Sequence, residues 1–154
     1  MVKFMIIDIV PPEAVGPVRI GMTMDEAERA LATIDGYDPQ SGSPAVYDSG
    51  MSIELEPAPG GTVGAIQVYR PYGPVRIEYR GIDLLGVPAA RVVEQLAELT
   101  ELEEDEGGRS YVAPSLLMSL WRPFVEDENP DEEQGHYFQS VLVARPGYYD
   151  GPND

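Results

Sequence analysis

His136 is the only histidine in the chain, and cysteine is absent. A Ser–His–Asp triad would have to use His136 as its base, but this residue follows a glycine behind an acidic stretch and no nucleophile-elbow motif occurs. The lack of cysteine excludes disulfides, zinc–thiolate sites and cysteine nucleophiles within the chain. A histidine-rich transition-metal site would need more than one histidine. We therefore expect a protein that is not an enzyme and that holds no cofactor.

An acidic segment, residues 127–133, spaces oxygen ligands two apart, as a calcium-binding loop does. The candidate metal ligands are Asp127, Asn129 and Asp131. The loop position that needs glycine is occupied by Glu132, and the position that needs a bidentate glutamate is Phe138. The segment is therefore not an EF-hand. We expect a solvated hairpin loop, and weak divalent-cation binding is the alternative.

Other catalytic patterns are missing. Acidic residues number 27, but no two of them stand in contrasting settings that would raise the pKa of one carboxyl and not the other. The glycine pairs at 60–61 and 107–108 lack the spacing of a phosphate loop or a dinucleotide fingerprint.

The net charge of −17 is the outlying property of the composition. Such a field repels nucleic-acid phosphates and anionic lipid headgroups and favours basic partners or divalent cations, although a charge that serves only solubility is the alternative. The apolar start, residues 1–10, contains Asp8 and runs into two prolines, so it is too short for a signal peptide or a membrane helix. We read it as a buried strand and expect a cytoplasmic protein that binds neither nucleic acid nor membrane. A single lysine among many Ala, Gly, Pro and Arg residues is typical of a GC-rich, actinobacterial genome.

Two amphipathic helices and several half-buried strands must position any site. Thr23 and Glu26 form a capping box, followed by apolar residues at helical spacing up to Ile34. A second helix begins near Pro88. Apolar and polar residues alternate over 51–56, 65–69, 75–80, 116–121 and 141–143, as in antiparallel strands with one face towards water.

Sliding the chain on itself reveals a degenerate repeat. A shift of 65 residues places 20–23 on 85–88, a shift of 66 places 56–57 on 122–123, and a shift of 75 places 66–71 on 141–146. We therefore predict an α+β fold: two tandem helix-then-antiparallel-sheet units that form one sheet, with the helices packed on one face. The chain, 1–154, is expected to be a single domain, with one unit at about 1–72, the other at about 73–150, and a short acidic C-terminal tail.

The outward-facing side of the second unit is too apolar to be purely solvated. It is expected to carry Leu117, Ser119, Trp121, Phe138, Ser140 and Leu142, with Tyr69 on the same side in the first unit. The predicted protein-binding residues are Trp121, Phe138, Tyr69, Leu117 and Leu142, because buried aromatic residues tend to dominate interface energies.

The segment Ile20-Gly21-Met22-Thr23-Met24-Asp25-Glu26-Ala27 and the order of elements over residues 16–146 resemble two families. These are the β-lactamase inhibitory proteins of actinobacteria and the small lipoproteins of the outer-membrane β-barrel assembly machine. The resemblance implies the fold and the habit of holding another protein on an open sheet. The inhibitors' disulfides and the lipoproteins' lipidated cysteine have no counterpart here.

Together these features favour a non-enzymatic, acidic protein-binding module, such as an immunity or inhibitor protein that acts on a basic partner. The alternatives are a small-molecule or divalent-metal-binding module, and a self-associating domain in which the apolar patch pairs with its own copy as a homodimer.

Overall fold

The computed structural model describes residues 5–125, 131 and 133–148 and is built from two β-sheets and two helices. The small sheet has five strands in the order β3 (Val18–Arg19), β2 (Ala14–Val15), β1 (Met5–Val10), β7 (Val75–Tyr79) and β8 (Ile82–Asp83). Its central strands, β1 and β7, run parallel, and its other pairs are antiparallel.

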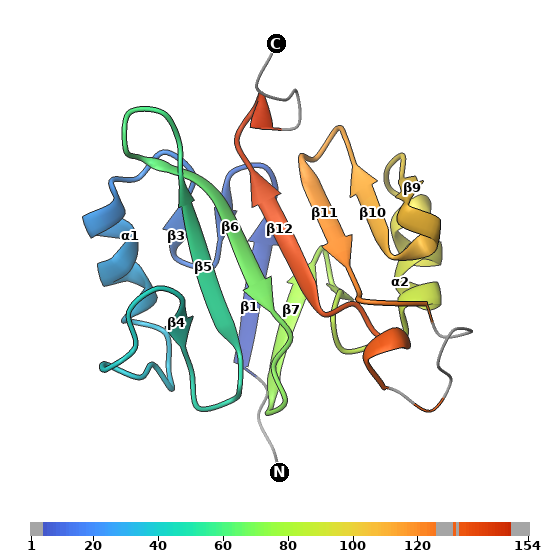
Figure 1. Cartoon of the computed structure of the whole chain (residues 1–154), viewed down its shortest axis with the longest axis horizontal. Helices are drawn as coiled ribbons and strands as arrows, with labels where there is room; N and C mark the ends of the chain where they lie inside the picture. The colour runs from blue at the N-terminus through green and yellow to red at the C-terminus, as the bar shows by residue number, and fades with distance from the viewer. Residues whose placement is uncertain (1–4, 126–130, 132, 149–154) are drawn as a thin grey trace.

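The large sheet has seven antiparallel strands and lies in front of the small sheet (Figure 1). Their order is β4 (Ala45–Val46), β5 (Ser52–Pro57), β6 (Val63–Tyr69), β12 (Ser140–Ala144), β11 (Met118–Trp121), β10 (Ser110–Ala113) and β9 (Glu103–Asp105). Two single-turn 3-10 helices, η1 (Glu106–Gly108) and η2 (Glu133–Gly135), lie in the second half of the chain.

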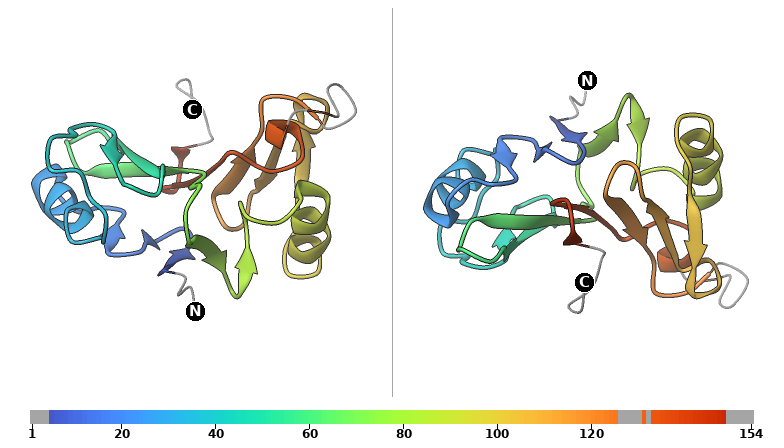
Figure 2. Two further views of the ribbon diagram at one scale, coloured as in Figure 1. Left: turned by 90° about the horizontal axis from the view of Figure 1, so that it is seen from below. Right: turned by 90° about the horizontal axis from the view of Figure 1, so that it is seen from above.

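The two α-helices, α1 (Met24–Leu31) and α2 (Ala89–Ala97), flank the two stacked sheets at opposite ends (Figures 1 and 2). The capping box predicted for the first helix is confirmed. The Thr23 hydroxyl accepts a hydrogen bond from the Glu26 backbone N–H, and the Glu26 carboxylate accepts one from the Thr23 N–H. The Thr23 N–H and the Thr23 hydroxyl both donate to the Glu26 carboxylate, and these two bonds lower the pKa of Glu26 because they favour its charged form. Pro88 precedes α2 and provides no side-chain cap.

The prediction of one sheet with both helices on one face is wrong, although the chain is α+β in the broad sense. Each half of the chain contributes strands to both sheets, with β1 and β7 paired in one and β6 and β12 paired in the other. Alternation of apolar and polar residues along a strand shows which of its faces is buried, but it does not show which other strand pairs with it. The two halves of the chain pair through the parallel strands β1 and β7 in the small sheet and through the antiparallel strands β6 and β12 in the large sheet. A single twofold axis through both stacked sheets cannot produce both arrangements, so it cannot relate the two halves.

The core fills the space between the two sheets. Ile7 and Ile77 point into it from the small sheet, and Ile66, Val68 and Val141 point into it from the large sheet. The helices close its two ends with their apolar stripes; the buried helical residues are Ala27, Leu31, Ala89, Val92 and Leu96. Burial of these side chains supplies the main favourable term for folding.

The first described strand, β1, is only half buried, in contrast to the buried strand that its composition predicts. Ile7 and Ile9 face the core, while Ile6 and Val10 are 51% and 49% exposed on the opposite side. In the part of the chain that the structure describes, no helix has the length and apolar character needed to span a bilayer.

Candidate functional site: the outer face of the large sheet

The outer face of the large sheet carries the exposed Trp121 and is not covered by either α-helix (Figure 1). Register places Tyr69, Ser140 and Trp121 directly beside one another on β6, β12 and β11. The next row holds Gln67, Leu142 and Ser119 on the same three strands. We call this surface the Trp121 face; its residues are Gln67, Tyr69, Ser119, Trp121, Ser140 and Leu142, of which Ser140 is only 1% exposed.

Hydrogen bonds fix the polar part of the Trp121 face. The Tyr69 hydroxyl donates to Gln67 Oε1 over 3.1 Å, and Gln67 Nε2 donates to Ser140 Oγ over 3.1 Å. Burial and then the charges of Glu54 and Glu56 raise the pKa of Tyr69, so its hydroxyl stays protonated and can donate. The face is therefore preorganised, which lowers the entropy lost when a partner binds.

Carboxylates border the Trp121 face on both sides. Glu54 and Glu56 project from β5, and Glu103 and Asp105 lie on the exposed edge strand β9. Glu54 stands in the row of Gln67, and the same row ends at Glu103 on the far side. Glu56 also accepts a hydrogen bond of 2.7 Å from the Tyr148 hydroxyl.

The structure brings three of the five predicted binding residues, Tyr69, Trp121 and Leu142, to this one face. Leu117 is half-buried in the turn before β11, with a φ of +52°, and its carbonyl accepts a hydrogen bond from the Ala144 N–H. Trp121 is 41% exposed.

Phe138 is 0% exposed and belongs to the core, so it is not available as an exposed anchor. It lies outside β12, where the alternation that places Ser140 and Leu142 outward no longer applies. Its ring packs edge-on against Tyr111, with centroids 5.7 Å apart, and the Arg122 guanidinium lies over it at 5.7 Å. Apolar character alone could not distinguish this buried ring from an exposed one.

Arg122 is 8% exposed and joins the two 3-10 helices η1 and η2, a role that its sequence context did not indicate. Its Nε donates to the Gly108 carbonyl over 3.0 Å and its Nη1 donates to the Gly135 carbonyl over 2.9 Å. A buried guanidinium held by carbonyls is costly to desolvate but strongly orders the groups that it joins.

The remaining chemical candidates do not converge. Asp131 is exposed, whereas Asp127, Asn129 and the acidic C-terminal tail lie outside the described residues. His136 is half-buried, and its carbonyl accepts a hydrogen bond of 2.8 Å from the Ala89 N–H at the start of α2. Within residues 5–125, 131 and 133–148, no group of three or more His, Asp or Glu side chains is arranged to hold a metal ion.

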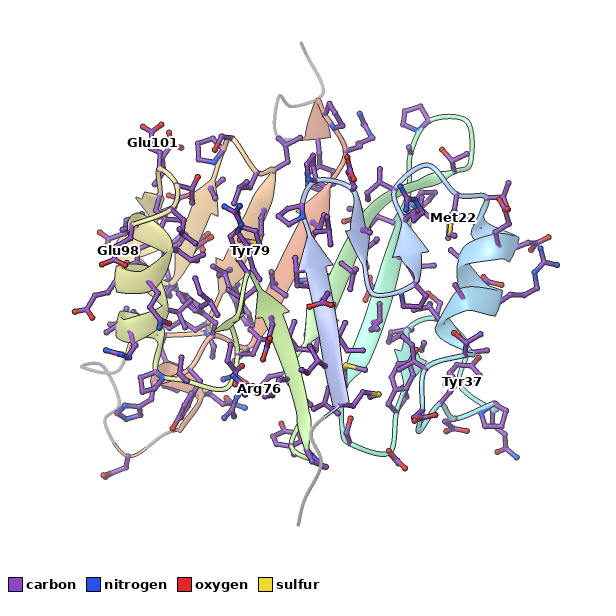
Figure 3. All side chains as sticks on the ribbon, turned by 180° about the vertical axis from the view of Figure 1, so that it is seen from behind. Met22, Tyr37, Arg76, Tyr79, Glu98 and Glu101 are labelled. Atoms are coloured by element: carbon purple, nitrogen blue, oxygen red, sulfur yellow. The ribbon has the colours of Figure 1, made fainter. Side chains whose placement is uncertain are left out.

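The small sheet has a different outer face, seen from behind in Figure 3. Register aligns Asp8, Glu78 and Asp83 on three adjacent strands, an arrangement in which like charges repel. Arg76 compensates for two of them: its Nε lies 3.0 Å from Glu78 Oε2 and 3.6 Å from Asp83 Oδ2. This Nε is buried and not in hydrogen-bond geometry, so both contacts are ionic.

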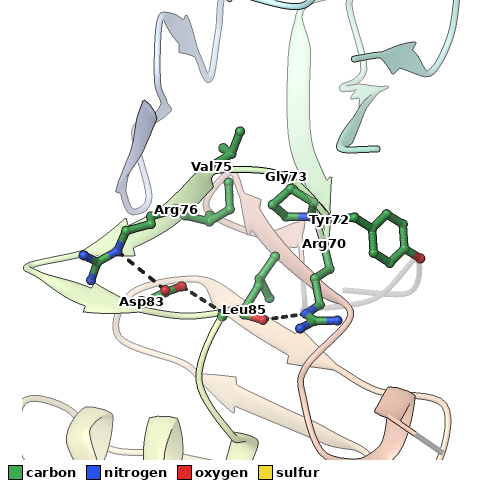
Figure 4. Close-up of a pocket in the computed structure, with 10 residues that line it drawn as sticks. Arg70, Tyr72, Gly73, Val75, Arg76, Asp83 and Leu85 are labelled. Atoms are coloured by element: carbon green, nitrogen blue, oxygen red, sulfur yellow. Dashed lines mark hydrogen bonds and ion pairs between the residues drawn. The ribbon is translucent and has the colours of Figure 1, made fainter. Parts of the chain in front are cut away.

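A pocket of about 360 Å³ opens where β6 leads into β7 (Figure 4). Its floor includes the buried Ile77 and Leu85, and Arg70 and Arg76 line its walls. Arg70 Nε donates to the Leu85 carbonyl over 2.8 Å, and its guanidinium lies 4.3 Å from the centroid of the Tyr137 ring. Asp83 shares the pocket and accepts a hydrogen bond from the Gly86 N–H, so positive and negative groups face the same space.

Comparison of the chain with protein-family models, with curated protein sequences and with solved structures gives no match.

Proposed function

We propose that the protein is a non-enzymatic binding module, of the immunity or inhibitor type, whose Trp121 face engages a basic protein. The observation that carries this proposal is the exposed Trp121, aligned with Tyr69 and bordered by carboxylates on both sides. Tryptophan and tyrosine are enriched among the residues that dominate interface energies. Charged residues around them influence which partner binds and how fast it associates. The net charge of −17 adds long-range attraction for a cationic protein.

The test is capture of a partner on the immobilised protein, followed by titration of that partner in purified form. Trp121→Ala is expected to weaken binding by about 30-fold or more, equivalent to about 2 kcal/mol. Leu99→Ala is the matched control, because Leu99 is an exposed apolar residue that follows α2 and lies off the Trp121 face. A partner with net negative charge, or a Trp121→Ala variant that binds at full strength, would contradict the proposal.

Self-association through the same face is a less favourable explanation of this surface. A second copy would bring its own Glu54, Glu56, Glu103 and Asp105 towards the same carboxylates, and like charges in an interface are unfavourable. Sedimentation velocity at low and high salt distinguishes the two: a monomer even at high salt, where the repulsion is screened, agrees with the proposal, and a dimer that Trp121→Ala dissociates would replace it.

The pocket between β6 and β7 supports a second candidate function, the binding of a small ligand that carries a carboxylate. Its volume of about 360 Å³ falls in the range of ligand sites, and arginine suits planar carboxylate recognition. Citrate and benzoate are suitable calorimetric probes. Saturable binding that Arg70→Gln abolishes would favour this candidate, and absence of heat at millimolar concentrations would remove it.

A further inference from the structure

We infer that the partner presents to the Trp121 face an amphipathic α-helix whose apolar stripe is bordered on both sides by Lys or Arg. This inference rests on the proposed function and adds the form of the segment that docks. It follows from the width of the uncharged strip, from the hydrogen-bonding needs of a segment laid on a sheet face, and from the position of the carboxylates.

The uncharged strip is four strands wide. Between Glu54 on β5 and Glu103 on β9, the row contains only uncharged side chains, which are Gln67, Leu142, Ser119 and Val112. Adjacent strands lie about 4.8 Å apart, so the backbone positions of the two glutamates are separated by roughly 24 Å. The neighbouring row, through Tyr69 and Trp121, reaches Asp105 at the same edge.

A helix satisfies the constraints of this strip better than an extended segment does. A strand lying on the face of a sheet would bury backbone N–H and C=O groups against side chains without partners, which is costly. A helix satisfies its own backbone groups and is about 10–12 Å across. It therefore fits between the two acidic borders and leaves room on each side for Lys or Arg side chains to reach outward.

The composition of the strip matches the stripe of such a helix. Tyr69, Leu142 and Trp121 offer apolar surface on three of its four strands, while the polar Gln67 and Ser140 are already hydrogen bonded to each other. A sheet face is ordinarily covered by another layer, and neither described α-helix of this chain covers this one. A cationic helix from a partner would cover this sheet face and would also place positive charge beside its acidic borders.

The edge strands make pairing at the sheet edge a poor alternative. At one edge β4 has only two residues. At the other, β9 carries Glu103, Glu104 and Asp105, all exposed. Short and highly charged edges disfavour strand addition.

Two synthetic peptides of about 18 residues and identical Lys, Leu and Ala content provide the test. In the first, the Leu residues follow helical spacing with Lys on both sides of the stripe; in the second, the same residues are permuted so that no stripe forms. Trp121 is the only tryptophan of the chain, and the peptides contain none, so its emission reports contact at this face. We expect a saturable blue shift and a gain of helical circular dichroism with the first peptide, and at least tenfold weaker binding of the second.

Charge variants locate the two borders. Glu54→Gln and Glu103→Gln should each weaken binding of the first peptide by about two- to fivefold, the range of exposed ion pairs. Glu28→Gln is the matched control, since Glu28 is an exposed acid on α1. A loss that is equal for all three variants would overturn the inference, because only the net charge would then matter.

The outcomes separate the inference from the proposed function. If both peptides bind equally and shift the Trp121 emission equally, the face accepts basic partners but the helical geometry is wrong. Binding of the first peptide without a gain of helical circular dichroism would likewise mean that the helical geometry is wrong. If neither peptide shifts the emission at low salt, both the inference and the proposed function fail.

Discussion

Tyr69 and Trp121 stand in one cross-strand row, with Ser140 of the intervening strand between them. This relationship exists because β12 inserts between β6 and β11, which places residues from distant parts of the chain on one surface. The Trp121 face is therefore a product of the sheet order, and its integrity depends on the strand that separates the two aromatic residues. Residues that form this surface should respond to substitution differently from residues that support it.

Trp121 and Phe138 should respond oppositely to truncation. Trp121→Ala is expected to change the free energy of unfolding by about 1 kcal/mol or less, because the side chain is already 41% exposed. Phe138→Ala should cost about 3–5 kcal/mol, since it opens a cavity in the core. Urea denaturation followed by far-ultraviolet circular dichroism measures both. Equal losses would mean that Trp121 belongs to the core and that the binding proposal lacks its anchor.

Arg122 should prove to be a structural residue. Arg122→Met removes the donors to the Gly108 and Gly135 carbonyls and is expected to cost about 2–4 kcal/mol of unfolding free energy. Arg122→Lys should recover only part of this loss, because one ammonium does not reproduce the two separated donors of a guanidinium. Denaturant titration of the three proteins is the measurement, and a fully stable Arg122→Lys variant would contradict this role.

Tyr47 should make the fold sensitive to high pH. Its hydroxyl is buried and donates to the Leu31 carbonyl over 2.7 Å at the end of α1. Burial, and to a smaller extent Tyr37, raises the pKa of Tyr47 far above its ordinary value. The unfolded chain ionises this residue near pH 10 while the folded protein keeps it neutral, so the unfolding free energy should fall as pH rises above about 10.

The Tyr47→Phe variant isolates that effect. It should lose about 1 kcal/mol at neutral pH, because the Leu31 carbonyl loses its donor. Above pH 10 its stability should fall less steeply than that of the unmodified protein, by up to about 1.4 kcal/mol per pH unit. Parallel stability curves for the two proteins would show that other groups govern the response.

Arg76 should matter through the carboxylates beside it. Arg76→Met leaves Glu78 and Asp83, with side chains only 13% and 16% exposed, adjacent and uncompensated. We expect a loss of roughly 1–2 kcal/mol, moderated by solvent because Arg76 itself is 40% exposed. Adding Glu78→Gln should restore most of the stability. Strictly additive losses in this double-mutant cycle would show that the ion pairs contribute nothing.

The sequence allowed local features to be predicted where the signal is local. The Thr23 and Glu26 capping box depends on residues three apart, and the structure contains it. Tyr69, Trp121 and Leu142 share a face because alternation assigns each side chain to one side of its strand. Phe138 was misassigned because the alternation was extended beyond the start of β12 at Ser140.

The features of the fold that could not be predicted from the sequence depend on pairing between distant segments. The parallel alignment of β1 with β7 and the insertion of β12 beside β6 are contacts between distant segments, and no residue pattern within a strand encodes them. Arg122 was overlooked for a related reason: its partners are backbone carbonyls, which have no side-chain signature.

The central place of β12 in the large sheet has a consequence for how the protein is made. β12 follows every other described strand along the chain, yet it lies between β6 and β11, so the two halves of the large sheet cannot pair until β12 has been synthesised. During synthesis β6 and β11 each present an unpaired edge, the kind of surface on which chaperones act and nascent chains aggregate. The large sheet therefore becomes continuous only when the last of its described strands is in place.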